Sequence, residues 1–302
     1  DASQQKAWDE LAARDNGVLS LAPGKGKTVL GLKKVAQRGF HAIVIVNNGG
    51  LLKQWIERAK EHLGLDADDI GIIKQKKSQW DKPLVIGMIQ TLANRNSDIP
   101  MEVRQRFGTV IFDAVHHLPA THFSKTASMF YGNRYGLSAT PDRADGMSPA
   151  YYAHVGNVFY QDLKSDVPAL TLFLKLDYVV NEKKMNDRSG SFHHLKMCIE
   201  MAKMKRRNKA IIRCVIRMLQ DDRKVLVLSH AKIHPEILRD MFQEVAGSDA
   251  WSVGLVVQST SDDDRTGIIR NSDVTFASFK IAMEGLDVPA LDTVVFTSPF
   301  SS

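Results

Sequence analysis

The sequence predicts an α/β protein of two domains, each built on a parallel sheet flanked by helices. Three observations predict this fold. The chain has 302 residues, enough for two domains of ordinary size. Hydrophobic residues make up 44% of it, enough to fill packed cores. Short apolar runs alternate with amphipathic stretches in both halves, which is typical of parallel sheets covered by helices.

In the first half, short apolar runs predict strands at residues 17–21, 41–46, 83–89, 109–112 and 135–139. Between them, residues 28–38 and 51–63 repeat apolar side chains at the spacing of a helix that covers a sheet. The pattern stops in residues 141–192, where turn residues mix with short strands.

The alternation then resumes with a long helical segment around residues 194–219. Further strands are expected at residues 224–230, 253–257, 274–278 and 291–296. We therefore expect a first domain over residues 1–160, a connecting segment over 161–193 and a second domain over 194–302.

Charge and cysteine content restrict the functional class. Forty Lys and Arg against 34 Asp and Glu give a net charge of +6, which is compatible with a nucleic-acid partner but is weak evidence alone. Cys198 and Cys214 form no CxxC pair or Cys/His cluster, so neither a zinc site nor a disulfide framework is indicated. No apolar run reaches the ~18 residues that cross a membrane, and no signal pattern opens the sequence. A cytoplasmic protein without membrane association is expected.

The stretch SLAPGKGKTVLGL, residues 20–32, predicts a phosphate-binding loop between a strand and a helix. Gly24 and Gly26 permit backbone conformations that side chains would block. Lys27 would reach the β- and γ-phosphates, and the Thr28 hydroxyl would bind Mg²⁺. The full GxxxxGKT pattern is not met, because Leu21 stands in place of its first glycine.

Asp113 is the expected partner of this loop. It ends another predicted strand, and in an open parallel sheet both groups would lie at the carboxyl ends of the strands, where ligands bind. Asp113 would then hold Mg²⁺ through water. A lone aspartate at a strand end is more often a cap or turn residue, but the GKT loop favours the metal site.

Further segments make the sequence similar to the superfamily 2 helicases, especially the XPB-like and phage UvsW-like enzymes. They are DAVHH (113–117) for a DEAH-type motif II, GLSATPDRADG (136–146) for motif III, NNGGLLKQW (47–55) for motif Ia, IQTL (89–92) for the next nucleic-acid motif, KVLVLSH (224–230) for motif IV and ASFKIAMEGLDVPALDTVVF (277–296) for motif V.

This resemblance implies two RecA-like domains, ATP and Mg²⁺ as cofactors, and a monomeric motor on nucleic acid, most readily DNA. The nucleotide residues that it implies are Gln4 for adenine, Gly24, Lys25, Gly26, Lys27 and Thr28 for phosphates and metal, Asp113 and His116 in motif II, and Gly285 and Asp287 from the second domain. Ser138 and Thr140 would couple the nucleotide to domain movement, and Asn48, Gln90 and Thr91 would face the nucleic-acid backbone.

Several of these assignments have a plainer alternative. Gln4 could be a solvated helix residue, Ser138 and Thr140 could cap a turn, and Asn48 stands where the family commonly has threonine. The basic clusters at residues 75–77 and 203–209 could be solvated surfaces rather than binding grooves.

Two departures from the family concern catalysis. Ala114 occupies the position of the glutamate that polarises the attacking water, and general-base catalysis is typically worth ~10²–10⁴-fold. Such a lone alanine resembles an engineered trapping substitution more than natural decay. The arginines of motif VI are expected after motif V, but the sequence ends at FTSPFSS, so we expect a truncated second domain.

The expected function is an ATP-dependent DNA helicase or translocase for duplex or branched DNA, impaired in hydrolysis by Ala114. Two alternatives remain open at this point. One is a nucleotide-gated clamp that binds nucleic acid without turnover, and the other is the motor segment of a restriction-type machine.

Overall fold

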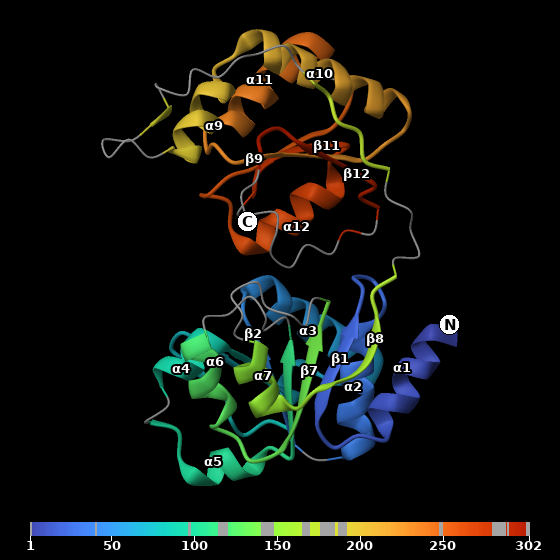
Figure 1. The fold of residues 1–302 in the computed structure, drawn as a ribbon, viewed down its shortest axis with the longest axis vertical. Coiled ribbons are helices and arrows are strands. Elements are labelled where there is room, and N and C mark those ends of the chain that lie inside the picture. The colour runs from blue at the N-terminus through green and yellow to red at the C-terminus, as the bar shows by residue number, and fades with distance from the viewer. Residues whose placement is uncertain are drawn as a thin grey trace. The chain divides into compact units, whose positions relative to one another are not determined.

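The computed structural model describes residues 2–39, 41–95, 98–113, 120–139, 148–164, 170–175, 185–186, 192–247, 250–279, 288 and 290–299. The chain divides into two compact units, Asp1–Leu170 and Thr171–Ser302. Each unit is a sheet with helices on its faces, as predicted (Figure 1). No helix among these residues is long and apolar enough to cross a bilayer.

The first unit is built on an eight-stranded sheet. In spatial order, its strands are β4 (Lys77–Ser78), β3 (Ile70–Lys74), β5 (Leu84–Met88), β2 (Ala42–Val46), β6 (Thr109–Asp113), β7 (Asn133–Ser138), β1 (Gly17–Leu21) and β8 (Val158–Asp162). All neighbours are parallel except β3 and β4, which form an antiparallel hairpin. The carboxyl ends of the parallel strands therefore lie along one edge, which we call the carboxyl edge.

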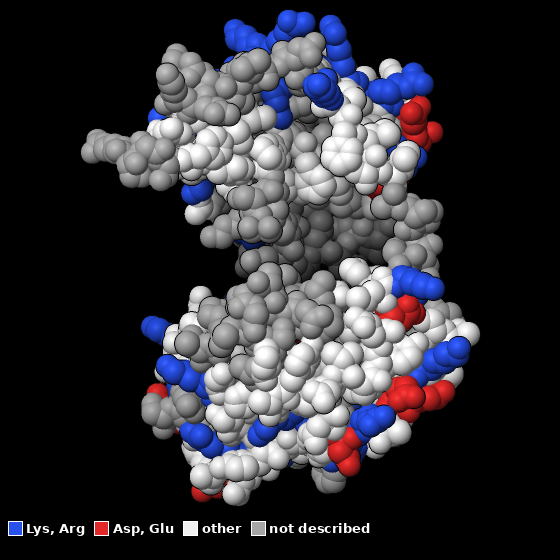
Figure 2. All heavy atoms as spheres, in the orientation of Figure 1, with Lys and Arg blue, Asp and Glu red and all other residues white. Residues whose placement is uncertain are grey.

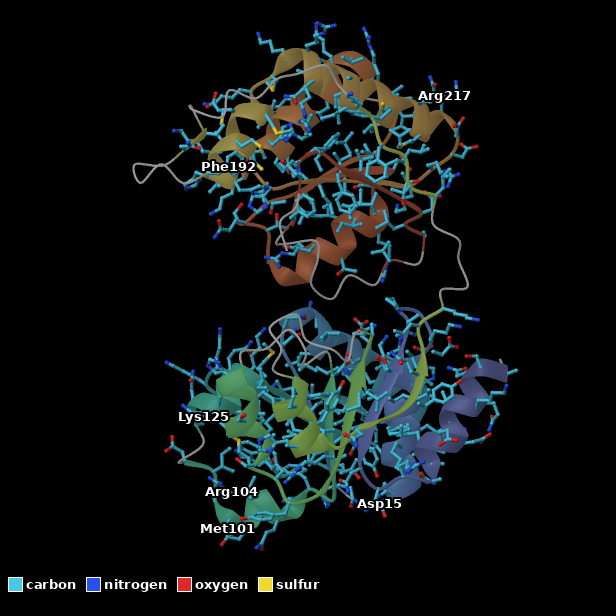
Figure 3. All side chains as sticks on the ribbon, viewed as in Figure 1. Asp15, Met101, Arg104, Lys125, Phe192 and Arg217 are labelled. Carbon is cyan, nitrogen blue, oxygen red and sulfur yellow. The ribbon has the colours of Figure 1, made fainter. Side chains whose placement is uncertain are left out.

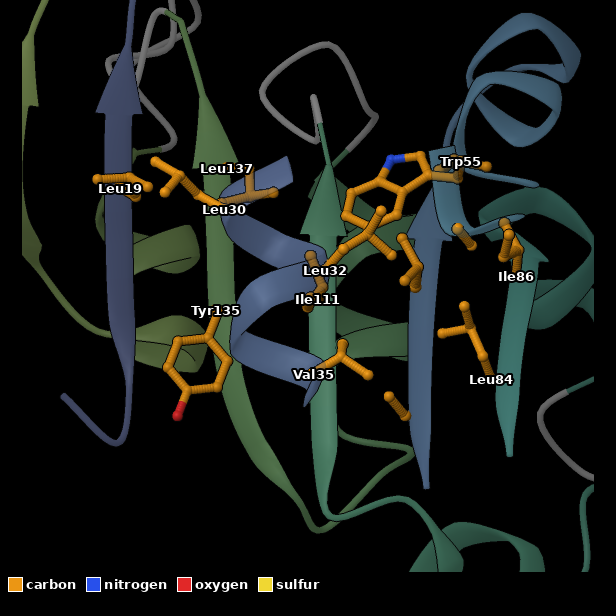
Figure 4. Close-up of a cluster of buried hydrophobic side chains, with 14 of the residues drawn as sticks. Leu19, Leu30, Leu32, Val35, Trp55, Leu84, Ile86, Ile111, Tyr135 and Leu137 are labelled. Atoms are coloured by element: carbon orange, nitrogen blue, oxygen red, sulfur yellow. The ribbon is translucent and has the colours of Figure 1, made fainter. Parts of the chain in front are cut away.

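Helices cover both faces of this sheet. One face carries α1 (Ala2–Ala12), α2 (Lys27–Arg38) and α3 (Gly49–Leu63), and the other carries α4 (Ile89–Asn94), α6 (Ala120–Ala127) and α7 (Ser148–Val155). A short 3-10 turn (Ala67–Asp69) and α5 (Met101–Arg106) complete the unit. Figure 4 shows the core under α2, where Leu30, Leu32 and Val35 pack on the strands.

The five strands predicted in the first half are confirmed as β1, β2, β5, β6 and β7. Each of them is almost wholly buried, because it lies inside the sheet with a helix on both faces. Strands β3, β4 and β8 were not predicted. They lie at or near the two margins of the sheet, where β4 and β8 are partly exposed and need no continuous apolar run.

The second unit has a four-stranded parallel sheet. Its order is β10 (Val253–Val256), β11 (Val274–Ser278), β9 (Val225–Ser229) and β12 (Thr293–Phe296), which confirms the four strands predicted in this half. One face packs against α10 (Lys205–Gln220) and α11 (His234–Ala246), and the other against α12 (Asp262–Asn271).

The helical segment expected around residues 194–219 is divided into α9 (His194–Ala202) and α10. The chain turns at Met204, whose backbone is extended (φ −80°, ψ 95°). The amide of Asn208 donates to the carbonyl of Ala202 at 2.7 Å and so satisfies the end of α9.

A buried polar network fixes α10 and α11 to the end of β9. His234 places Nδ1 at 2.7 Å from the Ser229 hydroxyl and Nε2 at 3.0 Å from Oδ1 of Asn208. Burial, and then the nearby charge of Arg207, lower the pKa of His234 to about 4. The imidazole is therefore neutral near pH 7, and the network joins the KVLVLSH segment to its two covering helices without a buried charge.

Candidate nucleotide site and nucleic-acid edge

The loop between β1 and α2 has the backbone of a phosphate cradle. Gly24 and Gly26 adopt left-handed conformations, with φ of 80° and 77°. Gly26 precedes the first turn of α2 without a side-chain cap, which is the arrangement in which helix N–H groups bind an anion. A Cβ at Gly26 would also collide with the carboxamide of Gln4, so the structure brings the candidate adenine-reading residue onto the loop.

Lys27 lies against this loop. Its ammonium donates to the carbonyl oxygens of Leu21 at 2.8 Å and Ala22 at 3.1 Å. Burial lowers the pKa of Lys27, and the negative charge of Asp113 opposes that shift. The loop lysine and the motif II carboxylate are thus electrostatically coupled, although the loop follows β1 and Asp113 ends β6, two strands that β7 separates in the sheet.

Asp113 ends β6 at the carboxyl edge and is only 5% exposed. The indole N–H of Trp55 donates to its Oδ2 at 2.7 Å. A buried carboxylate at a strand end, next to a lysine and a helix N-terminus, provides the hard oxygen donor and the positive charge that a Mg²⁺-nucleotide requires. The residues therefore fit the cofactor that the resemblance implies.

Trp55 is a site residue that sequence reasoning missed. It lies in the NNGGLLKQW segment but, as part of the apolar face of α3, it looked like an ordinary core residue. The indole is fully buried in the core of the first unit (Figure 4). A Cβ on Gly31 of α2 would approach Cη2 of Trp55 to 2.7 Å. Because Gly31 has no side chain, it leaves room for the indole that donates to Asp113. This glycine is the feature of the sequence that could have indicated the position of Trp55.

Replacing Trp55 by Phe should remove the indole hydrogen bond from the buried carboxylate of Asp113. We expect a loss of about 1–3 kcal/mol in the free energy of unfolding and a weaker Mg²⁺ dependence of ATP binding. Urea unfolding and ATP titrations at several Mg²⁺ concentrations measure both. Trp80→Phe is the matched control, because Trp80 is half-buried against Phe130 away from Asp113. Unchanged stability and Mg²⁺ dependence in Trp55→Phe would show that the indole only fills space.

Asp162, at the end of β8, holds the phosphate loop through hydrogen bonds. Its carboxylate accepts hydrogen bonds from the Ser3 hydroxyl and from Lys25, the latter at 3.3 Å, and its carbonyl accepts the Ala22 N–H at 2.8 Å. The Ser3 hydrogen bond is the main cause that lowers the pKa of Asp162. Lys25 is therefore held by an aspartate, and nothing in the local sequence indicated this partner.

The three candidate nucleic-acid residues lie at the carboxyl edge of β2 and β5. Asn48 caps α3, with Oδ1 accepting the Leu51 N–H at 2.8 Å. Gln90 donates to the carbonyl of Asn47 at 2.9 Å, which joins the two segments. The Thr91 hydroxyl accepts the N–H of Gln75 at 3.1 Å, so the turn of the β3–β4 hairpin is attached at the same place.

The remaining candidates divide into two that are described and five that are not. Thr28 is the second residue of α2, directly after Lys27. Ser138 is the last residue of β7, is 2% exposed and pairs in register with Ser20 of β1. β7 lies between β6, which ends at Asp113, and β1, which precedes the phosphate loop. Residues outside the described part of the chain are Ala114, His116, Thr140, Gly285 and Asp287.

Comparison with known proteins shows which families the chain resembles. Residues 1–143 match the family described as Type III restriction enzyme, res subunit. DNA 3'-5' translocase XPB2 of Sulfurisphaera tokodaii is 32% identical over 161 residues, which are 53% of this chain and 34% of that protein. The chain is similar to superfamily 2 helicases. An Acanthamoeba polyphaga mimivirus protein, provisionally named ATP-dependent RNA helicase L396, is 26% identical to this chain over 95% of its length and 55% of the mimivirus protein.

The structure of S. cerevisiae Dbp5 bound to RNA and ADP BeF3 shares the fold of this chain. The TM-score is 0.66 at 14% identity, over 99% of this chain and 75% of the Dbp5 chain. The expected RecA-like sheets flanked by helices are thereby confirmed. The chain spans about half or less of the curated relatives named above. Helicases of the kind that it resembles use ATP with Mg²⁺, and its helicase homologues bind nucleic acid.

Proposed function

We propose that the chain is the motor of an ATP-dependent DNA helicase or translocase that acts on duplex or branched DNA, with hydrolysis impaired at Ala114. The observation that carries this proposal is the convergence of the phosphate loop, Lys27 and Asp113 at one edge of the first sheet. The XPB-type relatives, whose names specify DNA, favour DNA over RNA.

Each residue then has a separate task. The backbone of Gly24 to Gly26 and the ammonium of Lys27 would hold the phosphates, with Gln4 beside the base, and Gly285 and Asp287 would also take part in nucleotide binding. Thr28 and Asp113 would hold Mg²⁺, which supplies charge stabilisation during phosphoryl transfer. Trp55 and Asp162 would keep the carboxylate and the loop in position. Ser138 and Thr140 would couple the nucleotide site to domain movement. His116 belongs to motif II.

Ala114 favours a second candidate, a nucleotide-gated clamp. Binding of phosphates and metal requires none of the atoms that alanine lacks, whereas activation of the attacking water does. Such a chain would grip nucleic acid when ATP is bound and would release it slowly. We place either activity in a cytoplasmic monomer that does not bind membranes.

The family match favours a third candidate, the motor segment of a restriction-type machine. In that case a nuclease would accompany this motor in the same chain or complex. DNA cleavage by the full-length protein would distinguish this machine from a helicase that only moves along DNA.

Nucleic-acid binding should be electrostatic and largely indifferent to base sequence, since the expected contacts at Gln90 and Thr91 face the backbone. We expect the affinity to fall steeply as salt rises, for two DNA strands of unrelated sequence alike. Fluorescence anisotropy with labelled DNA at several salt concentrations measures this. An affinity that ignores salt, or that selects one base sequence, would argue against a motor that tracks the backbone.

A further inference from the structure

The outer face of α10 carries a continuous stripe of positive charge. Lys205, Lys209, Arg213 and Arg217 recur every four residues, so they lie above one another on one side of the helix. All four are exposed, Arg217 with 76% of its side chain accessible. Figure 2 shows Lys and Arg side chains gathered over α10, and Arg217 is labelled on this outer face in Figure 3.

The opposite face of α10 explains why the stripe is fixed in place. Ile212, Val215 and Leu219 are buried against the sheet, and buried Asn208 joins the network of His234. Arg207 is directed inward, where it donates to the carbonyl of Thr297. These contacts fix the rotation of α10 about its own axis. Arg207 therefore faces inward, and the residues of the stripe face outward.

The stripe is unfavourable for the helix that carries it. Three successive pairs of like charge stand at i, i+4, and such pairs destabilise a helix. Lys205 and Arg206 occupy the first turn, where the helix dipole disfavours cations. The helix contains no acidic residue that could offset them. A helix face that only needed to be soluble would mix both signs of charge.

Within the described residues, the stripe is also poorly neutralised from outside. Arg217 has a long ion pair with Asp221 at 3.8 Å, and no carboxylate in the described part of the chain pairs with Lys205, Lys209 or Arg213. By contrast, the nearby Lys203 pairs with Glu200 at 2.8 Å. From Lys205 to Arg217 the helix rises roughly 18 Å, at 1.5 Å per residue, a length over which one DNA strand presents about five phosphates.

We propose that the outer face of α10 is a second nucleic-acid surface, which binds the phosphodiester backbone and belongs to a different unit from the carboxyl edge described above. The inference rests on the nucleic-acid binding proposed above and adds a contact that none of the helicase motifs contains. A stripe of this length suits a duplex arm of a branched DNA, because it meets a straight run of phosphates without reading bases.

The test replaces the middle of the stripe by Lys209→Gln and Arg213→Gln together. Glutamine keeps a long stem and a good helix propensity, so only the charges are removed. The matched control is Lys60→Gln with Lys125→Gln, two exposed lysines in the last turns of α3 and α6 of the first unit. Both variants lose two positive charges, so a difference between them reports on position and not on net charge.

The affinity for DNA and the Tm should change in opposite directions in the stripe variant. We expect the stripe variant to bind duplex DNA roughly ten-fold more weakly near 0.1 M salt, with a salt slope smaller by about 1.8, from ~0.9 per phosphate contact. Its Tm should rise by about 1–4 °C, because all three like-charge pairs are removed. The control should change little in either measurement. A purely structural role would lower stability and binding together.

The outcomes separate this inference from the proposed function. Parent and stripe variant binding DNA equally, with equal salt slopes, would overturn the α10 surface and leave the proposed motor intact. A parent chain that binds no DNA would overturn both. Binding to vesicles of anionic lipid is measured for the same two proteins. If the parent binds the vesicles tightly, and the stripe variant loses this binding but still binds DNA like the parent, the stripe serves another polyanion and the inference is overturned.

Discussion

Replacement of Lys27 by alanine should weaken the binding of ATP with Mg²⁺ by about 10²-fold or more. The ammonium would make charge-assisted hydrogen bonds to phosphate oxygens, and each such bond contributes roughly 1.5–3 kcal/mol, so losing two gives this factor. In the structure, the same ammonium already donates to the Leu21 and Ala22 carbonyls at 2.8 and 3.1 Å, which shows that it lies within reach of the loop interior. Isothermal titration calorimetry measures the change directly.

Lys33→Ala is the control for this prediction. Lys33 lies on the same helix but is exposed, with its ammonium 4.0 Å from the ring centroid of Trp8. Its removal should leave ATP affinity within about two-fold of the parent, because an exposed cation interaction of this kind contributes only ~0.5–1 kcal/mol to the fold. Equal ATP affinity in the parent and in Lys27→Ala would remove the loop from the nucleotide site.

Restoring the glutamate by Ala114→Glu should raise nucleic-acid-stimulated ATP turnover by ~10²-fold or more, with similar ATP affinity. The new carboxylate would accept a proton from the attacking water, which alanine cannot do. It would stand next to Asp113 at the mouth of a strand, where water and Mg²⁺ offset its desolvation, so folding should survive. The comparison requires two chains that both extend through the arginines of motif VI, since these also stabilise the transition state.

The result of this comparison decides between two proposals. A large gain in turnover supports a motor that alanine has arrested. Equal and slow hydrolysis by the two chains, with ATP and DNA bound by both, would show that residue 114 is not the missing catalytic group. The nucleotide-gated clamp would then be the better description of the protein.

Burial decided which strands could be predicted from the sequence. β2 (Ala42–Val46) and β6 (Thr109–Asp113) are interior strands whose every residue is buried, so each contains a run of apolar residues. β8 (Val158–Asp162) lies at the margin of the sheet and has no wholly buried residue, so its sequence VFYQD has no such pattern. The phosphate loop was predictable because a left-handed turn before a helix requires glycine, and Gly24 and Gly26 occupy those positions.

The contacts that support the site could not be predicted in this way. The hydrogen bond from Trp55 to Asp113 joins residues 58 positions apart, and that from Lys25 to Asp162 joins residues 137 apart. Neither pair leaves a local pattern, because each depends on how α3 packs and on which strand pairs with β1. Asn48 illustrates a different limit. The sequence suggested that it contacts nucleic acid, but asparagine is also a good helix cap, and in the structure Asn48 caps α3.

The pairing of β8 with β1 has a mechanical consequence. β8 is the last strand before the chain leaves the first unit, and its end, Asp162, stands in register with Leu21 at the start of the phosphate loop. Tension on the segment that follows would load the two parallel strands in shear, so that their hydrogen bonds resist together rather than opening one after another. The force would arrive at Ala22 and Lys25 through Asp162. A pull on the linker is therefore transmitted to the loop through the covalent chain and one strand pair.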